Sequence, residues 1–566
     1  MRSAVPFRAT AVAAGLAIAL LAASPAAAQW SSDPAVNTPV CTAPQSQYLP
    51  ALVSSVDGGS IAVWDDLRSG IQTLYGQRFD AAGFAQWTPN GLALAVSPGD
   101  MSVVSDGSGG VIVAWFDSQS PPIALHAQRF DSNGAAQWSP GGVIVTNSGF
   151  AHSPYVKMVS DGAGGADIVW STNFGPNVSR LYAQRIDGAG LLMWSGPVSV
   201  SADTTLGSRP QVDTDDAGGI VVAWVSYRGV DDIYAQHIDG AGARQWGEQG
   251  IGVAPQTTYN RYLPGIARDA GGGAVVVWKQ FHDVASGAQA TVLRQDLFAQ
   301  RIDGTGAILW APDGVPLTLG TANGAFEDTV CADGAGGAYV SYLGDSIRVQ
   351  HVTAAGMLPW GAAGLSVTKN NGSFWHPIVP APDGGVIAAW TSTNLLSAQS
   401  ISPSGQFRWS PQGLMVSTAT GSKSYPAILA DPYGGATFVW GDGRNSNPDL
   451  YGQRVNAGGT LDAPAPPEPP HAIHLSLSAV PCPSRAGALV HLRFALPTNG
   501  RVRLALYDVS GRLVRTLVDQ DETQGWARTA DWDGRDANSQ AVSAGVYLAR
   551  LISVSGAAET RIVRLP

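Results

Sequence analysis

Residues 106–115, Asp-Gly-Ser-Gly-Gly-Val-Ile-Val-Ala-Trp, and residues 161–170, Asp-Gly-Ala-Gly-Gly-Ala-Asp-Ile-Val-Trp, are two copies of one pattern. In both, an aromatic residue follows five positions after the second glycine of a Gly-Gly pair. The pattern occurs at Gly59/Trp64, Gly110/Trp115, Gly165/Trp170, Gly219/Trp224, Gly273/Trp278, Gly337/Tyr342, Gly385/Trp390 and Gly435/Trp440. Glycine tolerates the positive φ of tight turns, and β-branched runs are typical of strands. The pattern therefore predicts a repeated β-hairpin.

Each hairpin is followed by a strand-like run with a glutamine and then by a glycine with a tryptophan four residues later. The glutamines are Gln77, Gln128, Gln184, Gln236, Gln300, Gln350, Gln399 and Gln453, and the later tryptophans are Trp87, Trp138, Trp194, Trp246, Trp310, Trp360 and Trp409. We expect a fourth strand around each of these tryptophans. Four short strands in a unit of about 50 residues are typical of propeller blades. The sequence therefore predicts an all-β fold with an eight-bladed β-propeller of four-stranded blades over residues 29–463.

The two ends of the repeat array complement each other. In the last unit Ala463 stands where a tryptophan is expected, whereas Gln29 and Trp30 match the Gln-Trp pair at 86–87. We therefore expect the segment near Trp30 to Val36 to be the outermost strand of the eighth blade. Such a shared blade closes the ring and removes an exposed sheet edge.

The first 28 residues have the features of a secretory signal peptide. Arg2 and Arg8 precede an apolar run from Ala11 to Ala23, and the small residues 26–28 precede the expected cleavage site. This predicts an extracellular or outer-cell-surface protein, and no later stretch is apolar enough to cross a bilayer. The net charge is −10 and lysine occurs four times, so no nucleic-acid partner is implied.

Three cysteines, Cys41, Cys331 and Cys482, lie far apart and lack Cys-x-x-Cys spacing. We expect free, buried thiols, with one long-range disulfide as the alternative. The histidines include no His-Glu-x-x-His pattern, and neither a phosphate-binding Gly-rich loop nor a Gly-x-Ser-x-Gly elbow is present. The sequence thus predicts no metal site, no cofactor and no catalytic residue.

Two resemblances concern the repeats. Asp187, Gly190 and Trp194 resemble the tryptophan-docking repeat of quinoprotein-like eight-bladed propellers, which implies packing between blades. The whole unit also resembles repeats of uncharacterised secreted bacterial propellers. This second resemblance rests on the motif Trp-x-Asp-x-Arg before a Tyr-Gly-Gln-Arg run. The motif occurs at Trp64, Asp66 and Arg68 and again at Trp440, Asp442 and Arg444. Because the strand Gln and Arg recur, we expect them to be structural and to tie neighbouring blades.

A Pro-rich linker, residues 464–473, precedes a C-terminal module at 474–566. Its motifs are Leu496-Pro497, the run from Tyr507 to Leu517, Trp532 to Asp536, Ser543 to Tyr547 and the basic, apolar end from Arg561 to Leu565. In this order they resemble the FlgD-type immunoglobulin-like domain that also serves as a type IX secretion sorting domain. The resemblance implies a small β-sandwich and the secretion machinery as a partner. Pro481-Cys482-Pro483 replaces the family's Asn-Pro-Phe, and the terminal lysine is an arginine.

Function on a repeat scaffold usually lies in its variable loops. The two-to-three and four-to-one loops share one face, and they carry the predicted ligand-binding residues Asp66, Arg68, Tyr227, Arg228, His282, Asp283, Trp375, His376, Asp442 and Arg444. Further aromatic residues in the four-to-one loops include Tyr48, Tyr262 and Tyr425. The loop from Phe281 to Asp296 is expected to project beside the channel mouth. The same aromatic residues could instead simply plug the channel.

Aromatic rings beside Asp and Arg suit a carbohydrate or protein ligand. The first hypothesis is a secreted or surface-attached, non-enzymatic binding propeller with a glycan or surface protein as partner. The alternative is a propeller-fold glycosidase or lyase, which needs two carboxylates roughly 5 to 10 Å apart. A structural surface or adhesion protein is the third option.

Overall fold

The computed structural model describes residues 30–96, 98–117, 123–147, 155–175, 178–202, 207–228, 230–254, 260–269, 271–286, 290–318, 329–368, 375–392, 394–461, 476–480, 489–496, 500–522 and 525–565. The chain divides into two compact units at Pro464/Ala465. Every regular element in the described ranges is a β-strand. None of these ranges contains a helix able to span a membrane. The expected signal peptide and linker lie outside the described residues.

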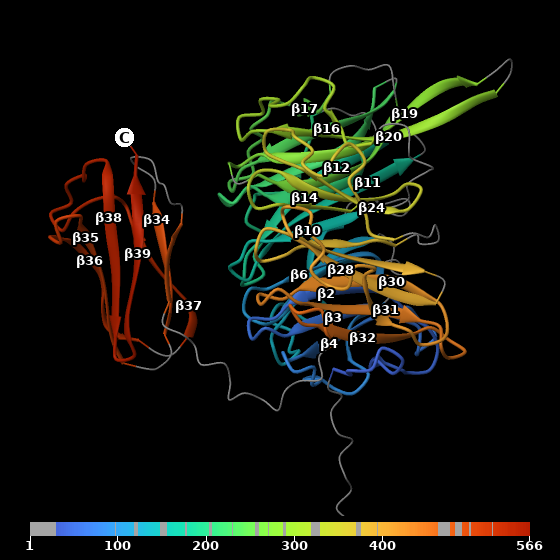
Figure 1. Cartoon of the computed structure of the whole chain (residues 1–566), viewed down its shortest axis with the longest axis horizontal. Helices are drawn as coiled ribbons and strands as arrows, with labels where there is room; N and C mark the ends of the chain where they lie inside the picture. Colours follow the sequence, from blue (N-terminus) through green and yellow to red (C-terminus); the bar gives the residue numbers. More distant parts are fainter. Residues whose placement is uncertain are drawn as a thin grey trace, which may run out of the picture. The chain divides into compact units, whose positions relative to one another are not determined.

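The first unit consists of eight four-stranded antiparallel sheets, which are the blades of a propeller (Figure 1). Seven of them use strands that are consecutive in the chain, and the eighth combines both ends of the unit. From the innermost strand outward they are blade 1, β2(Gln47–Ser54), β3(Ser60–Asp66), β4(Thr73–Phe79) and β5(Leu92–Val96); blade 2, β6(Pro98–Ser105), β7(Val111–Asp117), β8(Ala124–Phe130) and β9(Val143–Thr146); blade 3, β10(Val156–Ser160), β11(Ala166–Gly175), β12(Val178–Ile186) and β13(Val198–Ser199); blade 4, β14(Gly207–Thr214), β15(Ile220–Tyr227), β16(Asp231–Ile238) and β17(Ile251–Gly252); blade 5, β18(Arg261–Arg268), β19(Ala274–Ser286), β20(Ala290–Ile302) and β21(Val315–Pro316); blade 6, β22(Thr329–Ala332), β23(Ala338–Leu343), β24(Ile347–Val352) and β25(Leu365–Ser366); blade 7, β26(Ile378–Pro380), β27(Val386–Ser392), β28(Leu395–Ile401) and β29(Leu414–Ser417); and blade 8, β30(Lys423–Ala430), β31(Ala436–Asp442), β32(Asp449–Val455) and β1(Thr38–Cys41).

The repeated Asp-Gly-x-Gly-Gly segment forms the turn between the first two strands of a blade. In blade 2, Asp106 Oδ1 accepts hydrogen bonds from the backbone N–H groups of Ser108 and Gly110, both at 2.7 Å. Gly109 has a φ of +92° within this turn. The next strand is buried from Val111 to Phe116, because blades cover it on both faces. This explains why the second strand of each unit is a continuous apolar run.

The later tryptophan lies on a turn, so the expectation of a strand around it is wrong. In blade 1 the outermost strand begins at Leu92, five residues after Trp87. The side chain of Gln77 holds this turn, since its Oε1 accepts from the Trp87 N–H at 2.9 Å and its Nε2 donates to the Thr88 carbonyl at 2.8 Å. The glutamine therefore ties strands within one blade rather than neighbouring blades.

Contacts between blades come from the tryptophan and the strand arginine. The indole N–H of Trp138 donates to the carbonyl of Gly188 in the next blade, and its ring fills the space beside Gly190, where a Cβ would lie 2.7 Å from Cγ. Seven tryptophans donate to the next blade in this way over 3.0 to 3.2 Å: Trp87, Trp138, Trp194, Trp246, Trp310, Trp360 and Trp409. Arg129 bridges too, from Asp106 of its own blade to the Gly188 carbonyl.

The predicted ring closure is confirmed, with a corrected strand. The outermost strand of blade 8 is β1, Thr38–Cys41, rather than Trp30 to Val36, and it pairs with β32. Trp30 is 3% exposed and packs beside Gly83 of blade 1, as Trp138 packs beside Gly190. Ala463 lies outside the described residues. Cys41 and Cys331 are free thiols, and Cys482 also lies outside the described part.

The second unit is a two-sheet β-sandwich. One sheet is β33(Ser476–Val480), β34(Val490–Leu496) and β37(Gly525–Trp532); the other, in spatial order, is β36(Leu513–Glu522), β35(Gly500–Asp508), β38(Gly545–Ser553) and β39(Gly556–Arg564). Its core includes Leu492, Leu504, Trp532 and Leu551. The indole N–H of Trp532 donates to the Arg535 carbonyl at 2.8 Å, which holds the Asp-rich turn against the core. The predicted all-β class, with a propeller followed by a small sandwich, is therefore confirmed.

Candidate functional site

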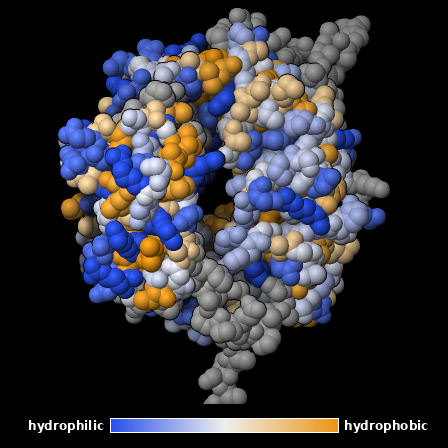
Figure 2. All heavy atoms as spheres, turned by 60° about the vertical axis from the view of Figure 1, so that its left-hand side comes forward, coloured by the Kyte–Doolittle hydropathy of each residue, from blue (hydrophilic) through white to orange (hydrophobic). Residues whose placement is uncertain are grey.

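The eight innermost strands surround a central channel, which Figure 2 shows as an opening through the ring. The turns between first and second strands lie at one end of the channel, called here the short-turn end. The innermost strands begin at the other end, called the long-loop end, beside the loops between second and third strands. Because neighbouring strands of a blade are antiparallel, every innermost strand runs from the long-loop end to the short-turn end. Residues at the start of each innermost strand therefore lie at the long-loop end.

Two predicted pairs, Asp66 with Arg68 and Asp442 with Arg444, are engaged inside their blades. Asp66 is fully buried, and its Oδ2 accepts from the Trp64 indole at 3.0 Å and from Arg68 Nη2 at 2.5 Å. Burial alone would raise the pKa of Asp66, but the hydrogen bonds from Arg68 and Trp64 outweigh it, and the net pKa is lowered. Arg68 also donates to the Asn90 carbonyl at 2.7 Å, just before the outermost strand. Their ligand-binding role stays a prediction.

Arg444 repeats this arrangement in blade 8. Its Nη2 binds Asp442 Oδ2 at 2.7 Å, and the Trp440 indole donates to the same oxygen at 2.9 Å. Its Nη1 reaches the Val36 carbonyl, just before β1, at 2.6 Å. The Trp-x-Asp-x-Arg motif thus anchors the outermost strand of blades 1 and 8, the first and last blades of the propeller.

The predicted residues Tyr227 and Arg228 lie at the end of the second strand of blade 4. Tyr227 is 48% exposed. The guanidinium of Arg228 lies over the ring of Tyr234, 3.9 Å from the centroid, and donates to Gln249 Oε1 at 3.3 Å. Arg228 is therefore held against its own blade, while Tyr227 presents its ring at the surface.

The predicted loop from Phe281 to Asp296 is instead a long β-hairpin. Strands β19 and β20 have 13 residues each, and their pairing continues to Ser286 and Ala290. Figure 1 shows this hairpin standing out from the body of the ring. The predicted residues His282 and Asp283 lie on β19 opposite Arg294 and Leu293. Their side chains lie outside the described part, so their role stays a prediction.

Trp375 and His376 precede the innermost strand of blade 7 but have different surroundings. The Trp375 ring lies 4.2 Å from the ring of Tyr425, on the innermost strand of blade 8. His376 is 2% exposed, and its Nδ1 lies 2.8 Å from Ser341 Oγ in blade 6. The structure therefore brings Trp375 and Tyr425 together at the long-loop end and buries His376 between blades.

A second aromatic pair stands at the same end in blade 5. The rings of Tyr262 and Phe281 meet edge to face, with centroids 5.2 Å apart. Burial, with a hydrogen bond to Asp231 of blade 4, raises the pKa of the Tyr262 hydroxyl to about 12. The hydroxyl therefore stays protonated at neutral pH and the Asp231 carboxylate serves as its acceptor.

One buried acid of this end, Asp65, was not predicted. It is 4% exposed, and one of its carboxylate oxygens has no hydrogen-bond partner among the described residues. Burial raises the pKa of Asp65 to about 6, and the negative charge of Asp100 adds to this rise. A hydrogen bond from Gln72 lowers the pKa but does not offset the rise. The sequence alone could have singled out Asp65, because it differs in kind from the residues at the equivalent position of the other units. The residues directly after the repeated aromatic are Asp65, Phe116, Ser171, Val225, Lys279, Leu343, Thr391 and Gly441. Asp65 is the single acid of this set.

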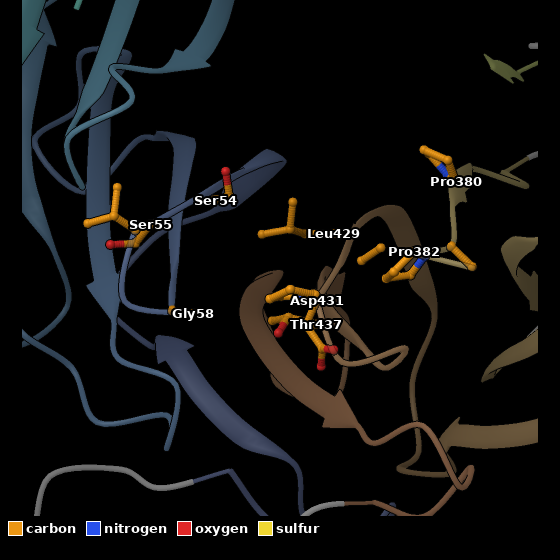
Figure 3. Close-up of a pocket in the computed structure, with 13 residues that line it drawn as sticks. Ser54, Ser55, Gly58, Pro380, Pro382, Leu429, Asp431 and Thr437 are labelled. Atoms are coloured by element: carbon orange, nitrogen blue, oxygen red, sulfur yellow. The ribbon is translucent and has the colours of Figure 1, made fainter. Parts of the chain in front are cut away.

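Two hollows lie at the short-turn end, where no site was predicted from the variable loops. One of about 450 Å³ lies between blades 7, 8 and 1, and Figure 3 shows Pro380, Leu429 and Ser54 on its sides. Another of about 360 Å³ adjoins it and is lined by the ends of the innermost strands of blades 1 to 5. Asp431, in the first hollow, already accepts from Arg454 at 2.8 Å and from its own turn. The linings of the two hollows are mainly apolar.

Among the described residues, no group of three or more His, Cys, Asp or Glu side chains could hold a metal ion. The polar chemistry of the long-loop end therefore rests on single carboxyl groups, on Arg side chains and on aromatic rings. Such an arrangement can bind a polar ligand with flat apolar faces.

No family model matches the chain, and no curated protein matches it. Among solved structures it is similar to a PL25 ulvan lyase bound to -[GlcA(1-4)Rha3S]-, with a TM-score of 0.39, 12% identity, and coverage of 62% of this chain and 91% of that one. It is similar to the α-L-arabinanase of Penicillium chrysogenum in complex with arabinobiose, with a TM-score of 0.35, 10% identity, and coverage of 64% and 94%. A Dyadobacter fermentans protein of unknown function matches with a TM-score of 0.31, 12% identity, and coverage of 56% and 94%. At these values the likenesses carry no functional argument, and the fold rests on the strand pairing itself.

Proposed function

We propose that this protein is a secreted or cell-surface, non-enzymatic binding propeller whose long-loop end holds carbohydrate. One observation carries the proposal: the ring of Trp375, just before the innermost strand of blade 7, and the ring of Tyr425, on the innermost strand of blade 8, have centroids 4.2 Å apart at the long-loop end. Both rings are half-buried, so each keeps part of its surface open. Aromatic rings with a few fixed polar groups are the usual lining of a site for a small polar ligand.

Polar groups elsewhere at the long-loop end support a sugar rather than a protein ligand. Asp231 and Tyr262 provide a fixed acceptor and hydroxyl beside the second ring pair. A protein partner would need a continuous interface of about 800 Å² on each side. Two separate ring pairs, one of them beside the Asp231 carboxylate, fit the alternating apolar faces and hydroxyl edges of a sugar.

A glycan array with the full mature chain tests the proposal. We expect binding by the wild type, about tenfold weaker binding by Trp375→Ala and Tyr425→Ala, and no change for Tyr433→Ala. Tyr433 is the matched control, because its ring is 56% exposed on a one-to-two turn at the short-turn end. Absence of wild-type binding to every glycan would refute the proposal, and a protein found instead on intact cells would favour the adhesion alternative.

A second candidate, a carbohydrate-active glycosidase or lyase, is favoured by Asp65. A buried carboxyl group with a pKa near 6 is suited to donate a proton, and this one occurs once in the ring. Glycans that the wild type binds should then be incubated with wild type and Asp65→Asn. Product release by the wild type, lost in Asp65→Asn with binding retained, would establish the enzyme. Binding without turnover would support the non-enzymatic propeller.

The C-terminal sandwich is proposed to be a sorting or anchoring module that engages a secretion machinery. The ordered motifs of the FlgD-type resemblance support this proposal. We propose with it that the chain is exported and acts outside the cell, which the predicted N-terminal signal peptide supports. Cell fractionation of the full chain and of a chain ending at Leu461 tests it, because loss of the module should retain the propeller inside the envelope. Equal export of both chains would refute the sorting role.

A further inference from the structure

Four innermost strands share a bulge at the same register. In blades 1, 4, 5 and 8 the pairing with the second strand skips two residues, and the second residue skipped is a proline. The residue before that proline has a positive φ in every case: Leu49 at 52°, Arg209 at 53°, Leu263 at 52° and Tyr425 at 50°. A bulge of this kind turns a side chain away from its regular direction.

The positive φ is costly for these residues, so its repetition needs a reason. Residues other than glycine seldom adopt this region, and Leu, Arg and Tyr have no side-chain group that offsets the strain. Backbone strain is concentrated where function requires a particular side-chain direction. Pro210, Pro264 and Pro426 are buried, whereas Leu49 is 41% exposed and Arg209 is exposed. In blades 4, 5 and 8 the bulge therefore keeps the proline in the blade, and in blades 1 and 4 it leaves the preceding side chain exposed at the long-loop end.

The four bulges form two pairs across the channel. In a ring of eight, blade 1 faces blade 5 and blade 4 faces blade 8. Leu49 is therefore opposite Leu263, and Arg209 is opposite Tyr425. The bulged backbone is the same in the four blades, but the side chain before the proline is Leu, Arg, Leu or Tyr. The structural Gln and the aromatic residues of the blades, by contrast, keep the same side chain or kind of side chain in every unit. This combination is expected of a set that selects a ligand.

Arg209 and Tyr425 offer different chemistry to such a ligand. No carboxylate of the described part of the chain forms an ion pair with Arg209, and a guanidinium with free donors binds carboxylates in a two-point fashion. Tyr425 lies against Trp375 and provides a ring platform. The two groups stand on opposite sides of the mouth, so one sugar unit cannot contact both.

We infer that the long-loop mouth selects an acidic oligosaccharide that spans the channel. One sugar unit lies on Tyr425 and Trp375, and a carboxylate of another unit binds Arg209, with Leu49 and Leu263 flanking the chain between them. This inference rests on the proposed function and adds the ligand's charge and minimum length to it.

Isothermal titration of the full mature chain tests the inference with oligogalacturonates of one, two, four and six units and with maltohexaose as the neutral probe. For the wild type we expect the hexauronate to bind at least about tenfold more tightly than the monomer. Arg209→Gln should weaken the hexauronate about tenfold and leave maltohexaose unchanged. Tyr425→Leu should weaken both. Arg348→Gln is the matched control, because Arg348 stands near the start of β24 at the same end but donates to Asp345 Oδ1 and to the Ala363 carbonyl, both at 3.0 Å; it should change neither.

Thermal unfolding of each variant shows whether its fold is intact, and the hexauronate titration is repeated with Arg209→Lys. Lysine keeps the charge but not the two-point geometry, so only partial recovery is expected. Equal binding of monomer and hexamer, or unchanged hexauronate binding by Arg209→Gln, would overturn the inference. Neutral glycans bound through Trp375 and Tyr425 would then leave the proposed function standing. A wild type that binds no glycan would overturn both.

Discussion

Arg444 of blade 8 donates to the backbone carbonyl of Val36 over 2.6 Å, although 408 residues separate them in the chain. The same guanidinium binds Asn37 Oδ1 at 2.9 Å, and Asn37 Nδ2 donates to the Val416 carbonyl at 3.0 Å. The segment before β1 is therefore held by side chains as well as by strand pairing. Closure of the ring depends on this set of contacts because β1 has only four residues.

The first prediction concerns Arg444→Gln. It should lower the free energy of unfolding of the propeller by about 1.5 to 3 kcal/mol, since the fully buried Asp442 loses its hydrogen bonds from Arg444 and keeps Lys423, 3.5 Å away, as its remaining charged partner. Urea unfolding followed by tryptophan fluorescence measures this. Arg268→Gln is the control, because its ion pair with Asp216 is about half exposed and should contribute less than about 1 kcal/mol. Equal losses in the two variants would contradict the anchoring role of Arg444.

The second prediction concerns Trp30→Ala. Removal of an aromatic side chain that is 3% exposed should destabilise the ring by about 3 to 5 kcal/mol. The transition of the C-terminal sandwich should stay unchanged in calorimetry, because its core contains no propeller residue. Trp87→Ala, the equivalent change inside the repeat array, should cost a similar amount. A Trp30→Ala melting curve that matches the wild type would show that the ring does not depend on this residue.

Much of the fold could be predicted because the repeat is regular. The spacing from Gly110 to Trp115 recurs in every unit, and the solitary Trp30 indicated where the ring closes. The limits of the outermost strands could not be predicted. Strands such as β13 and β17 have two residues each, so they are set by pairing rather than by a pattern that can be read from the sequence.

The candidate site was predicted less well, and the reasons are local. The Trp-x-Asp-x-Arg spacing directed attention to Asp66, which shares a face of its strand with Trp64 and is consequently buried with it. Asp65 points to the opposite face, by the two-residue period of a strand. The bulges were not predicted, because the positive φ of Leu49 or Arg209 depends on where the pairing skips, although the following prolines were visible.

The third prediction concerns the pH dependence of stability at Asp65. Its pKa rises from 3.8 in the unfolded chain to about 6 in the fold, so the folded state binds more protons between these values. The contribution of Asp65 to stability, measured as the difference between the wild type and Asp65→Asn, should therefore fall by on the order of 2 kcal/mol as the pH rises from about 4 to 6 and then level off. Asp65→Asn should remove this loss and be more stable than the wild type at pH 7.

Asp66→Asn is the neighbouring control with the opposite sign. The pKa of Asp66 is lowered in the fold, so its ionised form stabilises the protein above pH 3.8 and that contribution is lost as the pH falls through the folded pKa. Asp66→Asn should thus be less stable than the wild type at pH 7, and the difference should shrink in acid. Urea unfolding at pH 4, 5, 6, 7 and 8 measures both variants. A wild-type stability that rises between pH 4 and 6 in parallel with that of Asp65→Asn would contradict the assignment.

The last prediction separates strain from binding at Arg209. Glycine accepts a φ of 53° without the clash that a Cβ creates, so Arg209→Gly should be more stable than Arg209→Ala by about 1 kcal/mol. Both variants lack the guanidinium and should bind the hexauronate equally weakly. Urea unfolding and calorimetric titration of the two variants measure the two effects separately. In a regular strand the order is reversed, because glycine there is less stable than alanine by about 0.5 to 1 kcal/mol. A more stable alanine variant would therefore show that position 209 is not strained and that the bulge does not direct its side chain toward a ligand.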